Sequence, residues 1–193
     1  MKPTELILKG RLATSYIFNP FESKEGEHKK SWKLDLIFDP RSPEGAEQIK
    51  KIEAVIKTVC LDKWKKYPLT WPDAKRLCLR DGNLKIDKTD EVRDGYADMK
   101  YLTCSRNCVT SRGPNTPPGV FDRDKTPLGV GSTYPYNGCY VMVHVDLFGT
   151  EKGGRGIFAE LISVKMSREG DPLLGGGAGA VVSADVFGDE EEI

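Results

Sequence analysis

Alternating apolar and polar positions predict two strands near the start of the chain. One parity of residues 6–18 carries Leu6, Leu8, Leu12, Tyr16 and Phe18. The other parity carries Lys9, Arg11 and Ser15. A second alternation, over residues 32–38, places Trp32, Leu34, Leu36 and Phe38 on one face. Because successive side chains of a strand point to opposite faces, we expect two half-buried strands that pair as a hairpin.

The following segment changes from strand periodicity to helical periodicity. Asp39 and Pro40 end the second strand, Ser42 suits an N-cap, and Pro43 suits the first helical position. The apolar residues at helical spacing are Ile49, Ile52, Val55, Ile56 and Val59. A helix over residues 43–66 is therefore predicted, placed so that it covers one opening of a barrel. Residues 68–98 are charged and weakly periodic, and we expect a loop-rich insertion there.

Three further strands are predicted in the second half of the chain, the first over residues 99–110. Residues 138–149 alternate regularly, and their apolar parity comprises Cys139, Val141, Val143, Val145 and Leu147. In residues 155–166 the expected apolar face comprises Phe158, Ile162, Val164 and Met166. The pattern predicts an all-β fold with an inserted helix (β-rich α+β). A Greek-key barrel of the OB type over residues 1–172 satisfies it.

The charges are segregated along the chain although they sum to zero. The last nine residues contain no Lys or Arg, and their acidic residues are Asp185, Asp189, Glu190, Glu191 and Glu192. The rest is therefore net basic, which favours a polyanion-binding body and a tail that competes for the same surface. A solvated surface with a solubilising tail explains the charges equally well. Because a glycine-rich run precedes the acidic residues, residues 173–193 are predicted to be a flexible linker and tail.

The sequence offers little for catalysis, metal binding or membrane insertion. An odd number of cysteines favours reduced thiols, and Cys104 and Cys108 lack the further ligands of a zinc site. No nucleophile–base pair or phosphate-binding glycine motif stands out. The chain has no apolar run of about 20 residues and no signal-peptide layout at its N-terminus. We therefore expect a cytoplasmic, non-enzymatic protein with no cofactor, no metal and no membrane partner.

Several ordered stretches carry a family resemblance. They are residues 136–141 (YNGCYV), 155–157 (RGI), Leu161 with Val164, and 168–171 (REGD), together with LATSYIFNPF and SWKLDLIFD in the first quarter. In these stretches the chain resembles a tailed-phage family of single-stranded-DNA-binding proteins. The resemblance implies an OB fold, sequence-independent binding of single strands, and an acidic tail used for partner contacts and self-competition.

Such binding requires cations for the phosphates and rings on which bases stack. The residues that we expect to supply them are Lys9, Arg11, Lys29, Lys30, Trp32, Lys100, Tyr101, Arg106, Tyr134, Tyr136, Tyr140 and Arg155. Burial in the core is the rival interpretation for Trp32, whose parity favours it, and for Tyr101. A solvated outer face is the rival for Lys9 and Arg11. The expected partner-binding tail comprises Asp185, Val186, Phe187, Asp189, Glu190, Glu191 and Glu192.

Two main functional hypotheses follow from these features. In the first, the protein coats single-stranded DNA in phage replication or recombination, and its tail recruits replication or recombination proteins. In the second, it is a protein-interaction or virion-assembly module built on a β-barrel without nucleic acid. A nuclease is a weaker third hypothesis. A homodimer through an edge strand or the helix is compatible with each.

Overall fold

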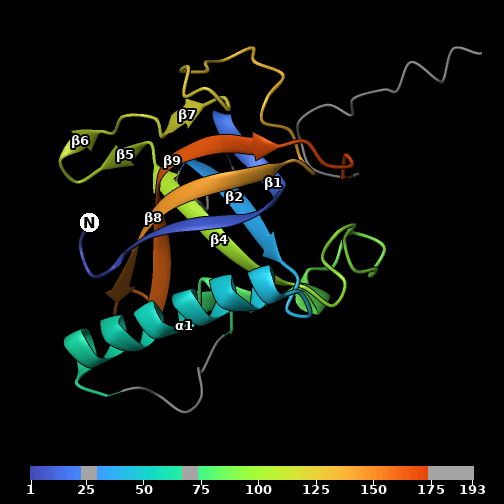
Figure 1. Ribbon diagram of the computed structural model, residues 1–193. Coiled ribbons are helices and arrows are strands. Elements are labelled where there is room, and N and C mark those ends of the chain that lie inside the picture. The colour runs from blue at the N-terminus through green and yellow to red at the C-terminus, as the bar shows by residue number, and fades with distance from the viewer. Residues whose placement is uncertain (23–29, 67–73, 174–193) are drawn as a thin grey trace, which may run out of the picture.

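Five strands close into a barrel in the computed structural model, which describes residues 1–22, 30–66 and 74–173 (Figure 1). These strands are β1 (Glu5–Phe21), β2 (Ser31–Phe38), β4 (Lys100–Asn107), β8 (Tyr140–Thr150) and β9 (Gly156–Arg168). β1 pairs with β2 and β8, β2 pairs with β4, and β8 pairs with β9. A parallel contact between β4 and β9 completes the circle. This is the Greek-key barrel of the OB fold, as the sequence predicts.

The predicted helix is α1 (Pro43–Trp64), which lies across one opening of the barrel (Figure 1). The Ser42 hydroxyl accepts a hydrogen bond from the backbone N–H of Gly45 at 3.0 Å, and Pro43 occupies the first turn. Both features stabilise the first turn of the helix, as the sequence predicts. Ile52, Ile56 and Val59 are buried against the barrel strands, so one stripe of the helix closes the core.

The core is clearest on β8. Its inward parity, Val141, Val143, Val145 and Leu147, is at most 1% exposed, as the alternation predicts. Each such side chain contributes about 1.5–3 kcal/mol through burial. The opposite parity of β8, which includes Tyr140 and Phe148, is half-buried or exposed. Strand parity therefore separates core from surface along the whole of β8.

Register shifts in the pairing of β1 and of β9 make the simple parity rule fail elsewhere. The pairing of β1 with β2 shifts between Leu12 and Ser15, so Ile17 becomes a core residue and Tyr16 turns outward. In β9 the register shifts opposite His144 and Val145, and the buried set becomes Ile157, Ala159, Leu161, Val164 and Met166. The predicted inward positions of Tyr16, Phe158 and Ile162 were therefore wrong, because an extra residue in a strand gives the segments before and after it opposite parities. In β9 the predicted inward positions after the shift, Val164 and Met166, are confirmed.

Short elements extend the barrel. They are the 3-10 turns η1 (Ala74–Arg76) and η2 (Gly82–Leu84) and the strands β3 (Leu79–Asp81), β5 (Val109–Thr110), β6 (Gly113–Pro114) and β7 (Gly119–Phe121). β3 adds to the edge of β4, and β7 lies parallel to β9. The segment that follows β3 folds back over the outer face of β2. No helix in the described ranges is both long and apolar enough to cross a membrane.

Candidate nucleic-acid interface

The outer face of β2 carries a buried carboxylate. Asp35 is 3% exposed and accepts hydrogen bonds from Lys85 Nζ (2.8 Å), the Tyr96 hydroxyl (2.7 Å) and the Thr103 hydroxyl (2.8 Å). Lys85 and Tyr96 belong to the segment after β3, whereas Thr103 lies on β4. Because a buried charge is tolerated only with such partners, Asp35 fixes this segment onto the sheet.

A second apolar cluster lies on this outer face, next to Asp35. It consists of the buried residues Ala13, Ile37, Tyr96 and Tyr101, with Met99 and Leu173 packed against them. The Tyr96 and Tyr101 rings meet edge to face, with centroids 5.2 Å apart. We call this cluster the aromatic ridge. It packs on Ile37, near the end of β2 that leads to α1. Lys33, farther from α1 on the same face, is half-buried.

Beyond the ridge, β1 and β2 present two rings and a cation. Tyr16 and Phe21 of β1 meet edge to face at 5.2 Å. Lys33 of β2 pairs with Tyr16 across the strands, and its Nζ lies 3.2 Å from the centroid of the Phe21 ring. We call Tyr16, Phe21 and Lys33 the strand face. Its side chains are half-buried and open to solvent.

The strand face has an excess of positive charge. The pKa of Lys33 is lowered, mainly by burial; Asp35 opposes this shift, and the neighbouring cations Lys85 and Arg93 add to it. Asp35 is ion-paired with Lys85 at 2.8 Å and also acts on Lys33, whereas Arg93 has Asp87 as a carboxylate neighbour. A phosphate placed here would gain attraction from all three cations and relieve their mutual repulsion.

This position agrees with the binding geometry of OB barrels, which use the second and third barrel strands and the loops beside them. Those strands are β2 and β4 here. The loop between β8 and β9 is another OB binding element, and Arg76 braces it by donating to the carbonyls of Lys152 (2.9 Å) and Gly154 (2.6 Å). The guanidinium of Arg155, in the same loop, lies 5.2 Å from the Trp64 ring.

A separate groove of about 590 Å³ lies on the other side of the aromatic ridge. Its lining includes Lys9 and Arg11 of β1, Tyr140 of β8 and Arg168 of β9. Met99 of the ridge and Gly95 form part of its wall, as does the first turn of α1. We call it the side groove. The structure thus brings Lys9, Arg11 and Tyr140 together, as expected of a common site, but apart from the strand face.

Other predicted contact residues have structural partners. Trp32 and Tyr101 are only 8% and 4% exposed, so both are buried, which was the rival interpretation for each. Lys100 is ion-paired with Asp81 at 3.1 Å, and Lys30 with Glu22 at 3.3 Å. Tyr134 is exposed, and the Tyr136 hydroxyl donates to the carbonyl of Gly170 at 2.8 Å. Lys29 and the predicted tail residues lie outside the described residues.

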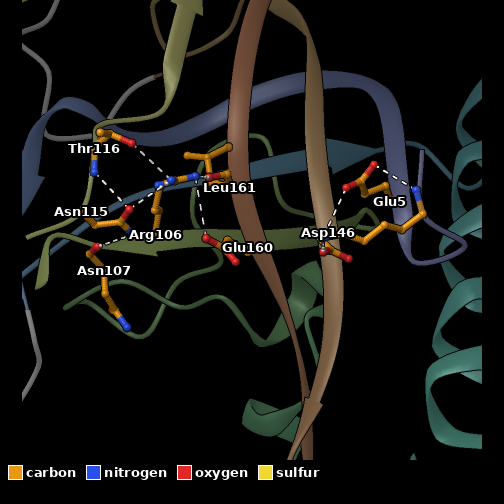
Figure 2. A network of polar contacts seen from close by, with 9 residues as sticks. Glu5, Arg106, Asn107, Asn115, Thr116, Asp146, Glu160 and Leu161 are labelled. Carbon is orange, nitrogen blue, oxygen red and sulfur yellow. Dashed lines mark hydrogen bonds and ion pairs between the residues drawn. The ribbon is translucent and has the colours of Figure 1, made fainter. Parts of the chain in front are cut away.

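Arg106 is the most heavily engaged of the predicted cations (Figure 2). It donates to the carbonyl of Leu161 (3.4 Å), the Asn115 side chain (3.1 Å) and the Thr116 hydroxyl (3.4 Å). Glu160 lies 3.7 Å away. These partners tie the loop after β6 to β9. The geometry gives Arg106 a bracing role for this loop, which its place in the sequence did not reveal.

Sequence reasoning missed Tyr16, Phe21, Lys33, Lys85, Arg93 and Arg168. Tyr16 was assigned to the core because the bulge in β1 leaves no clear pattern, although the small residues 13–15 are compatible with one. Lys33 has the outward parity in the sequence and could have been found from it. Lys85 and Arg93 lie in a segment with no periodicity, so nothing local indicates where they fold. In the described part of the chain, no group of three or more His, Cys, Asp or Glu side chains could hold a metal ion.

A closed OB barrel whose outer face carries solvent-accessible rings beside cations is typical of one class, the nucleic-acid-binding OB proteins. The comparison with known families agrees and is more specific. The chain belongs to the family described as Enterobacter phage Enc34, ssDNA-binding protein, whose model matches residues 4–193. This is a family of binding proteins rather than a class of enzymes.

Individual relatives extend this result. The chain is 34% identical to protein p50 of Acyrthosiphon pisum secondary endosymbiont phage 1, over 95% of this chain and 94% of that protein. Its fold is similar to the single-stranded DNA-binding protein of bacteriophage Enc34 in complex with ssDNA, with a TM-score of 0.70, 18% identity and coverage of 90% and 91%. It is also similar to gp2.5, a single-stranded DNA binding protein encoded by bacteriophage T7, with a TM-score of 0.55, 13% identity and coverage of 89% and 95%.

Proposed function

We propose that this chain is a sequence-independent single-stranded-DNA-binding protein of phage replication or recombination, and that the strand face is its principal binding surface. The observation that carries the proposal is the stack of Lys33 on Phe21, beside Tyr16, on one solvent-accessible face of the barrel. Lys85 and Arg93 are near enough to repel the Lys33 ammonium, so an anion would be attracted there. Family membership supports the same ligand.

The arrangement suits single strands because their bases are free to stack. Each base stacked on Tyr16 or Phe21 contributes about 1–3 kcal/mol. Lys33 covers the Phe21 ring in the free protein; a base takes its place, and the ammonium moves to a phosphate. In a duplex the faces of the bases are occupied by neighbouring pairs, so only the charge contribution remains.

The tail completes the proposal. The described chain ends at Leu173, which packs on the aromatic ridge between the strand face and the side groove. The acidic residues of the last segment therefore start from a point near both cationic surfaces and compete with DNA at high effective concentration. DNA displaces them, and the freed tail, with Val186 and Phe187 as apolar anchors, recruits replication or recombination proteins in the cytoplasm of the infected host.

The first test is a fluorescence-polarisation titration with labelled oligo-dT and a matched duplex, at low and moderate salt. Binding to the single strand should weaken with salt by about 0.7 log units of affinity per log unit of salt for each phosphate contact. The duplex should bind more weakly. Absence of oligo-dT binding at low salt, even without the tail, would contradict the proposal and favour the protein-interaction module.

Deletion of residues 183–193 tests the tail separately. Removing the competing acids should tighten binding at low salt and change it little at high salt, where the attraction is screened. Equal affinity of the full-length and truncated chains at low salt would show that the tail does not compete. DNA binding by the barrel would then stand without self-competition.

A further inference from the structure

The side groove has the features of a second binding site. Its cations come from two strands, with Lys9 on β1 and Arg168 on β9, and both side chains are exposed. Arg11 is half-buried and donates to the carbonyls of Gly138 (3.1 Å) and Asp171 (2.7 Å), so it braces the chain that follows β9. Lys9 and Arg168 are therefore the cations that remain available to a ligand.

A planar platform lies beside these cations. The guanidinium carbon of Arg168 is 3.4 Å from the centroid of the Tyr140 ring, which places the guanidinium on the ring face. Gly170 lies against one edge of the same ring, because a Cβ there would lie 3.1 Å from Cε2 of Tyr140. Since the guanidinium covers a face of the ring, a base would stack on the outer face of the guanidinium. Unpaired bases stack on guanidinium planes as they do on aromatic rings.

The wall formed by the start of α1 has the opposite charge. Asp39 and Glu44 line it. Asp39 accepts from the side chain of Arg41 at 3.0 Å, which offsets its charge, and Glu44 lies in the first helical turn, where the helix dipole favours it. A free anion would meet these carboxylates, whereas a nucleotide can turn its phosphate toward Lys9 and Arg168 and its base edge toward the acidic wall. The groove therefore favours a nucleotide segment over a simple anion.

The aromatic ridge separates this groove from the strand face. Ala13, Ile37, Tyr96 and Tyr101 are buried within it, so no stacking ring is exposed there. A single strand that follows both surfaces must cross the ridge without base contacts. We propose that the side groove is a second single-strand subsite, which engages a segment of the same DNA that the strand face binds. This inference rests on the proposed function and predicts a binding site that only longer strands fill.

The test compares oligo-dT of two lengths with three proteins. OB folds bind about 4–16 nucleotides, so an oligonucleotide of about 6 should occupy the strand face alone and one of about 20 should reach both surfaces. The groove variant combines Lys9→Ala and Arg168→Ala. The strand-face variant combines Tyr16→Ala and Lys33→Ala. The charge control combines Lys50→Ala and Lys57→Ala, which remove two exposed cations from α1 and so match the net charge of the groove variant.

The groove variant should bind the long oligonucleotide roughly tenfold more weakly and lose about 1.4 from its salt slope, as two lost phosphate contacts imply. Its affinity for the short oligonucleotide should match that of the charge control. Arg168→Lys keeps the charge but removes the planar guanidinium. This variant should therefore show the wild-type salt slope but only part of the wild-type affinity for the long oligonucleotide. The strand-face variant should weaken binding at both lengths.

Each failure has a distinct meaning. If the groove variant binds the long oligonucleotide as the charge control does, the second subsite is excluded and the strand face remains the proposed binding surface. If it weakens both lengths equally, the groove belongs to the primary site and the two-subsite inference is wrong. If the wild-type protein binds neither oligonucleotide, the proposed function itself fails. Circular dichroism and thermal melting show whether each variant remains folded.

Discussion

The two faces of β2 differ in chemistry although their residues alternate along eight positions. The inner face carries Leu34, Leu36 and Phe38, which are at most 2% exposed and pack within the hydrophobic core. The outer face carries Lys33 and Asp35, whose partners come from β1, β4 and the segment after β3. The comparison teaches that in this barrel stability depends on one parity of the strand and ligand binding on the other. Substitutions on the two faces should therefore separate stability from affinity.

The largest effect is expected on the inner face. Leu34→Ala removes a fully buried side chain and should lower the free energy of unfolding by about 3 kcal/mol, because the core cannot fully close around the cavity. Urea denaturation measures this loss. The fraction that remains folded should bind oligo-dT with wild-type affinity. A large loss of affinity in folded protein would mean that core and binding surface are not separable.

The next effect compares neighbouring residues of β1. Tyr16→Ala should weaken oligo-dT binding about tenfold through the lost stacking of a base. Ile17, which the bulge turns inward, gives the matched control: Ile17→Ala should cost about 2–5 kcal/mol of stability and leave the affinity of the folded protein unchanged. If Tyr16→Ala lowered stability and Ile17→Ala lowered affinity instead, Tyr16 would lie in the core and the bulge would be wrong.

A smaller effect should appear with pH. Burial, Lys85 and Arg93 lower the pKa of Lys33, so its charge is unfavourable in the free folded protein. Stability should therefore rise as pH increases from this lowered pKa toward the unfolded value of about 10.4. A bound phosphate raises the pKa again, so DNA binding takes up a proton and affinity should fall over the same alkaline range. Lys33→Arg should remove the part of this decline in affinity that depends on Lys33. Oligo-dT titrations at several pH values measure it. An unaltered pH profile in the variant would mean that Lys33 does not contact phosphate.

The smallest effect is expected for Tyr101. Its ring is buried in the aromatic ridge, so Tyr101→Phe keeps the packing against Tyr96 and should change stability by about 1 kcal/mol or less. Affinity for oligo-dT should not change. Tyr16→Ala gives the comparison on the same outer face: its ring is open to solvent and its loss should weaken binding, whereas Tyr101→Phe in the buried ridge should not. A loss of affinity in Tyr101→Phe alone would mean that the ridge opens to admit DNA.

Much of the barrel could be predicted from the sequence because its signals are local. The alternation in β8 and the Ser42–Pro43 helix start each depend on a few adjacent residues, and both are present as expected. The bulges in β1 and β9 depend on pairing with neighbouring strands, so a single parity could not describe either strand. The strand face was missed for that reason and because the partners of Asp35 come from distant, aperiodic sequence. Charge segregation and the family stretches indicated the ligand class but not the surface.

Photocrosslinking tests the central claim most directly. A short oligo-dT carrying a photoreactive halogenated uracil is irradiated with the protein, and mass spectrometry of the peptides identifies the attached residues. We expect attachment at Tyr16 or Phe21, and its loss when unlabelled oligo-dT competes. Attachment confined to residues away from the strand face, such as Phe148 or Tyr134, would contradict the account and move the primary DNA-binding surface elsewhere on the barrel.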